Sequence, residues 1–144
     1  MAGIVDGEGY VTLAGKRRDR NYYGCPLISI ASTSDDLIAW ITIHFPTSIK
    51  ICDRAVTAHT KASRMVRWLG KPAVALLMEL QPYLIVKSKQ AALVIASAEI
   101  NQLGKSRRGS HVPEWLIHRR IQIQQHLDML NGRGNDLYLV PSLS

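Results

Sequence analysis

The sequence predicts an α+β domain in which a four-stranded antiparallel sheet has helices on one face. Residues 10–32 and 48–68 each contain two runs that alternate between apolar and polar side chains, the pattern of half-buried strands. A helical segment precedes each strand pair, and only helical segments follow the second pair. Strands joined by a short connection are antiparallel, and helices grouped outside the strand pairs are typical of α+β domains.

Length, composition and charge fit a single basic domain. The chain has 144 residues, of which 47% are hydrophobic, enough for a substantial core. Its net charge is +7 and its sequence pI about 9.7. A basic surface favours a polyanionic partner, most often nucleic acid, and a soluble protein with spare lysines is the alternative.

Cysteine and histidine positions do not indicate a metal or disulfide framework. Cys25 and Cys52 form no CxxC pair, and the five histidines have no ligand spacing. No run approaches the roughly 18 apolar residues of a membrane span, and no signal peptide is visible. We therefore expect a soluble, intracellular protein of the cytoplasm or an organelle matrix that makes no membrane contact.

The first nine residues combine a short apolar run with an acidic, glycine-rich turn. A helix over residues 1–7 is too short to be stable alone, so it needs packing from elsewhere. Ala2 and Gly3 are small enough to let another backbone approach. Gly7 and Gly9 allow the chain to leave the helix.

The first hairpin is predicted over residues 10–32. Val11 and Leu13 share the buried face of its first strand, and Ile28 and Ile30 that of the returning strand, residues 27–32. Residues 16–21 form a basic hairpin tip. The outer face of the whole sheet then carries Tyr10, Thr12, Lys16, Arg18, Ser29 and Arg67.

A helix and a second hairpin follow. Residues 33–36 give a Ser or Thr cap followed by acidic residues, a helix start, and Pro46 ends that helix. The second hairpin spans residues 48–68. In its second strand Ala62, Val66 and Trp68 share the buried face, and Arg64 breaks the pattern.

Helices account for the rest of the chain. Residues 70–72 open one helix with a proline in its first turn, and Pro82 ends it. Ser88 is expected to cap a second helix, which extends to about Gln102. The last helix spans residues 113–130 and stops at a glycine-rich turn. The predicted domain is residues 1–134, with a tail at 135–144.

The opening nonapeptide resembles the LAGLIDADG motif of homing endonucleases, with Met1 in the first position and Glu8 in the second acidic one. Residues 80–91 are similar to the segment between the family's later helices, and residues 130–134 to its common C-terminal stop. The element order also fits the family's αββαββα core. The resemblance covers roughly residues 1–134 and is to the single-motif, homodimeric type.

This resemblance implies site-specific double-strand DNA cleavage with a divalent cation, Mg²⁺ or another such as Mn²⁺, by enzymes of mobile elements such as introns. In the family, motif helices of two subunits pack together at the two-fold axis, which implies interface positions for Ala2, Gly3 and Asp6. It implies that Glu8 and the backbone carbonyl of Gly7 bind metal. Catalytic roles are implied for Glu8 and Lys87.

The family's saddle-shaped sheet lies in the major groove of double-stranded DNA. A strand of ~10 residues spans ~33 Å, so a dimer would contact a pseudo-palindrome of about twenty base pairs. The implied DNA-binding residues are those of the outer face together with Arg20. Arg18, Arg20 and Arg67 can hydrogen-bond guanine edges or phosphates, and the sequence does not separate these.

One departure from the family pattern supports an alternative. Several members carry Gln or Lys at the end of the second strand to organise active-site water, whereas Ser32 and Thr33 stand there in this chain. The alternative function is a non-cleaving DNA-binding protein, or an intron RNA maturase on the same fold with RNA as its partner.

Overall fold

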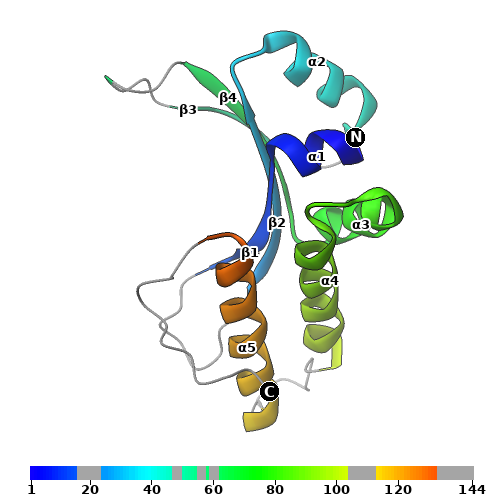
Figure 1. Ribbon diagram of the computed structural model, residues 1–144, viewed down its shortest axis with the longest axis vertical. Coiled ribbons are helices and arrows are strands. Elements are labelled where there is room, and N and C mark those ends of the chain that lie inside the picture. The colour runs from blue at the N-terminus through cyan, green and yellow to red at the C-terminus, as the bar shows by residue number, and fades with distance from the viewer. Residues whose placement is uncertain (16–23, 47–49, 55–57, 59–61, 104–112, 133–144) are drawn as a thin grey trace.

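The computed structural model describes residues 1–15, 24–46, 50–54, 58, 62–103 and 113–132 (Figure 1). The predicted hairpin tip with Lys16, Arg18 and Arg20, and the tail at 135–144, lie outside the described residues. The elements are, in order, α1 (Ala2–Glu8), β1 (Gly9–Ala14), β2 (Cys25–Ser32), α2 (Asp35–His44), β3 (Lys50–Arg54), β4 (Ser63–Leu69), α3 (Lys71–Leu80), the 3₁₀ turn η1 (Gln81–Tyr83), α4 (Ser88–Leu103) and α5 (Glu114–Leu130).

The four strands form one antiparallel sheet in the order β1-β2-β4-β3. Tyr10 of β1 pairs with Ser29 of β2, which pairs with Arg67 of β4. Paired residues of neighbouring strands share a face of the sheet. These three predicted outer-face residues therefore form one row across the sheet, and the predicted α+β class is confirmed.

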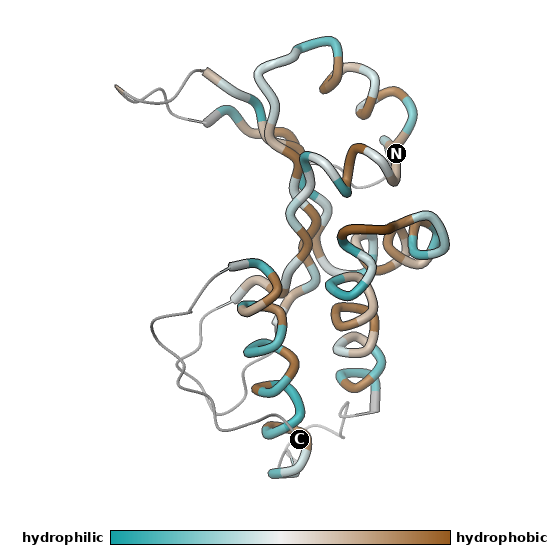
Figure 2. The backbone as a smooth tube through the Cα atoms, in the orientation of Figure 1, coloured by the Kyte–Doolittle hydropathy of each residue, from teal (hydrophilic) through white to brown (hydrophobic). Residues whose placement is uncertain are grey.

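The opposite, inner face of the sheet forms the core. Val11, Ile28, Ile30 and Val66 are completely buried, as the alternation predicted. They cluster with buried side chains from each of the described α-helices, α1 to α5. Figure 2 shows hydrophobic residues alternating with more hydrophilic ones along the strands.

Local signals place the helix ends largely as expected. The Ser34 hydroxyl accepts a hydrogen bond from the Leu37 N–H (3.3 Å), which makes Ser34 the N-cap of α2. Gly132, with φ of 70°, follows the end of α5. The expected cap at Ser88 differs: its hydroxyl donates to the Ile85 carbonyl (3.1 Å), and the structure places Ser88 inside α4 as its first residue.

Two expectations for β4 are revised by the structure. Ala62 is exposed and precedes the strand, so its predicted place on the buried face is wrong. Arg64 lies at the start of the strand, half exposed, with its Nε 3.4 Å from an Asp53 carboxylate oxygen and 3.9 Å from one of Asp35. These two acids explain why a charged residue interrupts the apolar alternation.

Helix α5 lies along β1, the outermost strand of the sheet on that side (Figure 1). Its Ile123 and Leu127 join the core, and the Asn131 side-chain amide just after the helix donates to the Val11 carbonyl (3.1 Å). Because α5 covers the edge rather than only the inner face, it can contribute side chains to both faces. Among the described residues, no helix is long and apolar enough to cross a membrane.

Candidate active site and nucleic-acid interface

The chain passes from α1 to β1 without a connecting loop, and Gly9 makes this possible. A Cβ placed on Gly9 would stand 2.6 Å from the Val5 carbonyl oxygen and 2.8 Å from the Val5 Cα. Real Cβ atoms do not approach backbone that closely, so the turn from helix to strand requires glycine here. Glu8 is consequently the last helical residue, directly at the start of the sheet.

Asp6 ties this junction to the connection between α3 and α4. One carboxylate oxygen accepts from the Ile85 N–H and the other from the Lys87 N–H, both at 2.8 Å. Partial burial raises the pKa of Asp6, but the N–H groups of residues 85–87 and the positive charge of Lys87 together outweigh it. The pKa therefore lies below its ordinary value, and Asp6 is ionised in the folded protein.

The structure thus brings two sequence-predicted residues, Asp6 and Lys87, together, with Lys87 half-buried. Glu8 is exposed two residues further along α1, so its side chain leaves the helix in a different direction from that of Asp6. Asp6 therefore makes hydrogen bonds within its own chain, to Ile85 and Lys87, in addition to the dimer-interface position that the sequence predicted for it.

Of the predicted seam residues Ala2, Gly3 and Asp6, Gly3 lies on the open side of α1, together with Gly7. Gly3 and Gly7 are exposed and one helical turn apart, and a Cβ on either would meet nothing within 4 Å. Ala2 is partly buried against the core. This side of α1 has room for another backbone at close range.

Glu8 and Gly7 supply the kind of oxygen that a hard divalent cation takes. The Glu8 carboxylate is exposed, and the last carbonyls of a helix lack intrahelical partners and carry partial negative charge. Carboxylate and carbonyl oxygens are the ligands of Mg²⁺ and Ca²⁺. Within the described residues, no group of three or more His, Cys, Asp or Glu could hold a metal ion.

A polar groove of about 430 Å³ lies on the outer face of the sheet, which we call the outer-face groove. It brings together four predicted DNA-binding residues, Tyr10, Thr12, Ser29 and Arg67. Two of them are nonetheless buried, since Thr12 is only 5% exposed and Ser29 only 8%. The other lining residues are Leu13, Ala14, Gly15, Leu27, Met65, Gln124 and Asp128.

Gln124 and Asp128 of α5 are site residues that the sequence analysis missed. Both are buried, at 8% and 4% exposure, and the Gln124 Nε2 donates to an Asp128 carboxylate oxygen (3.0 Å). The sequence did hold one signal for them: these two polar residues are four positions apart, so they share a face of the helix, next to the apolar positions 123 and 127. It could not show that the helix lies along β1 and directs these side chains to the outer face.

Arg67 lines the groove from β4. Its side chain is exposed, and its Nε donates to the Met65 sulfur (3.0 Å). The groove therefore has a guanidinium from β4 and a carboxylate from α5 among its lining groups.

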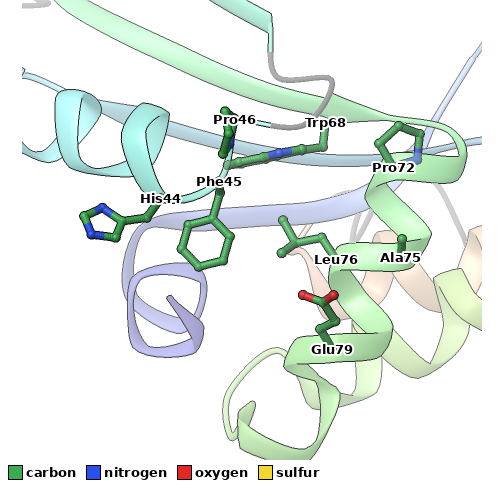
Figure 3. Close-up of a pocket in the computed structure, with 8 residues that line it drawn as sticks. All are labelled: His44, Phe45, Pro46, Trp68, Pro72, Ala75, Leu76 and Glu79. Atoms are coloured by element: carbon green, nitrogen blue, oxygen red, sulfur yellow. The ribbon is translucent and has the colours of Figure 1, made fainter.

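A second cavity of about 300 Å³ lies on the helical side of the sheet, between the end of α2, Trp68 and α3 (Figure 3). Its lining is mainly apolar, with Phe45, Trp68 and Leu76, and the Glu79 carboxylate points toward it. Trp68 belongs to the inner face of the sheet, so this cavity is separate from both Glu8 and the outer-face groove.

Two solved structures share the arrangement described above over nearly the whole chain. One is a crystal structure of the homing endonuclease I-CvuI in complex with its target in the presence of 2 mM Ca. It has a TM-score of 0.68 and 17% identity, and the match covers 99% of this chain and 83% of that one. The chain has the LAGLIDADG homing endonuclease fold.

The second LAGLIDADG structure is I-CvuI in complex with the I-CreI target in the presence of 2 mM Mg, in which the DNA is not cleaved. Its TM-score is 0.67 at 17% identity, with 97% of this chain and 82% of that chain covered. No protein-family model matches the sequence, and no curated protein matches it. The similarity is therefore one of fold, at low sequence identity.

Proposed function

We propose that this protein is a site-specific double-strand DNA endonuclease that acts as a homodimer, with a divalent metal ion, on a long pseudo-palindromic site. The observation that carries the proposal is the position of Glu8. It is an exposed carboxylate at the point where α1 meets β1, two residues after Asp6, which accepts from the Lys87 N–H, in a fold shared with DNA-bound homing endonucleases. A role in intron or other mobile-element homing would follow from this activity.

The open side of α1 supports a two-fold seam at this helix. Gly3 and Gly7 leave space for a partner backbone, and Ala2 is small. A seven-residue helix has little stability of its own, and packing against a second copy would add to what Asp6 provides. Such a seam would bring two Glu8 carboxylates close together.

The chemistry needs an attacking water and a stabilised leaving oxygen. Mg²⁺ or Mn²⁺, when bound, supplies both by polarising a phosphate oxygen and lowering the pKa of water. Glu8 and the Gly7 carbonyl would hold the ion, and phosphate oxygens and water would complete its ligands. The Lys87 ammonium would stabilise negative charge at the phosphate, and Asp6 holds the Lys87 backbone in place.

Double-stranded DNA would lie along the outer face of the sheet, where Tyr10, Thr12, Ser29 and Arg67 line one groove. Lys16, Arg18 and Arg20 precede β2 in a basic segment that would extend this contact. The net charge of +7 favours the encounter with DNA.

The deciding experiment selects cleaved sites from a randomised DNA library in the presence of Mg²⁺. The parent protein should enrich one pseudo-palindromic sequence. Glu8→Gln should keep DNA binding and lose about 10³-fold in cleavage rate, since the metal contribution is worth several kcal/mol of transition-state stabilisation. Glu99→Gln, which neutralises an exposed acid on α4, is the matched control. Equal cleavage by Glu8→Gln and the parent would refute the assignment.

A second candidate, a non-cleaving DNA-binding protein or an intron RNA maturase, is favoured by one observation. The Ser32 hydroxyl, at the end of β2, accepts a hydrogen bond from the Ser34 N–H (3.0 Å) and so serves the turn into α2. This small side chain is poorly suited to organising active-site water. Sequence-specific binding without metal-dependent cleavage, or support of intron splicing, would favour this candidate.

A further inference from the structure

Arg64, the charged residue that interrupts the apolar alternation of β4, lies at the same end of the sheet as Glu8. Gly9, which directly follows Glu8, pairs with Ile30 of β2, and Ile30 pairs with Val66 of β4. Arg64 lies two residues before Val66. Neighbouring strands are ~4.8 Å apart and a strand rises ~3.3 Å per residue, so the Cα atoms of Arg64 and Gly9 are roughly 12 Å apart.

The Arg64 guanidinium is held only loosely by its protein partners. Its Nε is 3.4 Å from an Asp53 carboxylate oxygen and 3.9 Å from one of Asp35, and both distances exceed that of a good N–H···O hydrogen bond. The Arg64 side chain is 54% exposed and each acid 84%, and ion pairs this exposed add little to stability. The two acids therefore accommodate the charge without binding it tightly.

A DNA phosphate is a stronger partner for this guanidinium than either acid. The guanidinium presents five N–H donors in a planar fork, which matches two oxygens of one phosphate. Bidentate pairs of this kind are short and roughly twice as strong as neutral hydrogen bonds. A distance of roughly 12 Å corresponds to three or four steps of ~3.4 Å along one DNA strand. A duplex with one phosphate at Glu8 therefore has others at the distance of Arg64.

We propose that Arg64 is a phosphate-binding residue that exchanges its contacts with Asp53 and Asp35 for a phosphate of the DNA backbone near the cleaved bond. This inference rests on the proposed binding of double-stranded DNA. Arg64 is not among the residues that line the outer-face groove, so its contact would position the DNA backbone without reading the sequence. The two carboxylates compete with phosphate for the guanidinium and so oppose binding.

The first test measures binding of a mixed-sequence DNA duplex at several concentrations of monovalent salt, without divalent cations. Arg64→Gln should bind about tenfold more weakly, the value of one charge-assisted hydrogen bond. The slope of log Kd against log salt should fall by about 0.9 per subunit, since one phosphate contact is lost. Arg64→Lys keeps the charge and should retain the slope. Arg119→Gln, which removes an exposed arginine of α5, is the control and should also retain it.

The second test separates phosphate binding from a merely structural ion pair. Asp53→Asn should tighten DNA binding in the parent, because it removes a competing carboxylate, and should have less effect in the Arg64→Gln background. A structural pair predicts instead that both single variants lower the melting temperature and that neither changes DNA binding.

Two results would overturn the inference. One is an unchanged salt slope for Arg64→Gln, with thermal unfolding verifying that the variant is folded. The other is equal tightening by Asp53→Asn in both backgrounds. A parent that binds DNA through Arg64 but does not cleave it with Mg²⁺ would refute the proposed endonuclease activity alone. A parent that does not bind duplex DNA would overturn this inference together with the proposed function.

Discussion

The α1–β1 junction and the outer-face groove are built in opposite ways. The junction consists of nine consecutive residues, and its proposed catalytic side chain, Glu8, is exposed. The groove is assembled from β1, β2, β4 and α5, and most of its polar residues are buried. The first is therefore defined mainly by backbone constraints within a short segment, with one tie to residues 85–87 through Asp6, and the second by how distant segments pack.

This difference predicts different sensitivities to mutation. Changes in the junction that alter the backbone should affect stability strongly, because Gly9 and Asp6 fix its path. Changes in the groove should mainly alter which DNA is bound. The following variants test the comparison, beginning with the largest expected effect on stability.

Gly9→Ala should destabilise the protein by about 3 kcal/mol, because its new Cβ would clash with the Val5 backbone, which cannot move without distorting α1. Urea unfolding measures the change. A loss of less than about 0.5 kcal/mol, the range of neutral surface substitutions, would mean that the junction is not fixed by this close approach.

Gly7→Ala is the matched control for that experiment, since its Cβ meets nothing within 4 Å. In the monomer this substitution should stabilise α1 by about 0.5–1 kcal/mol, the difference in helix propensity between Gly and Ala. At a dimer seam it should instead weaken association, which sedimentation at several concentrations detects.

Asp6→Asn should destabilise the protein by about 1–2 kcal/mol at neutral pH, since hydrogen bonds to a charged acceptor are stronger than those to an amide. The folded pKa of Asp6 is lowered, so its contribution is fully present above the unfolded value of about 3.9 and is lost as pH falls through the lower folded value. The stability difference between parent and variant, measured by urea unfolding, should therefore shrink only below about pH 4.

Asp36→Asn controls for the loss of a negative charge, because Asp36 is exposed in the first turn of α2. It should cost only a few tenths of a kcal/mol, about the value of a helix-dipole interaction at the surface. A pH dependence equal to that of Asp6→Asn would show that the effect is general rather than specific to the junction.

Apart from the controls, Asn131→Ala should have the smallest effect, a loss of about 0.5 kcal/mol. It removes the hydrogen bond to the Val11 carbonyl, but also removes the Asn131 Oδ1, which is buried without a hydrogen-bond partner. Thermal unfolding against the exposed Gln122→Ala on α5 provides the comparison. A loss above about 2 kcal/mol would mean that α5 depends on this one contact far more than a single hydrogen bond explains.

Elements governed by local signals were predictable from the sequence. The alternation of Val11, Ile28 and Ile30 correctly predicted the inner face, and Ser34 the start of α2. The link between Asp6 and residues 85–87 was not visible in composition or spacing, because 79 residues separate the two partners of its first hydrogen bond.

The outer-face groove was predictable only in part, because some of its residues are also far apart in the sequence. The shared outer face of Tyr10, Ser29 and Arg67 follows from strand alternation, whereas their register across the sheet and the presence of Gln124 and Asp128 in the groove depend on how the strands and α5 pack. Periodicity shows which side of a helix is apolar and does not show which edge of a sheet it meets. Arg64 could be placed only once Asp35 and Asp53 were known to lie beside it.

The position of α5 along β1 also bears on self-association. An outermost strand presents unpaired N–H and C=O groups that can pair with a strand of another molecule. Here the helix and the Asn131 side chain cover that side of β1. A protein shortened before α5 would therefore be expected to aggregate through the uncovered strand.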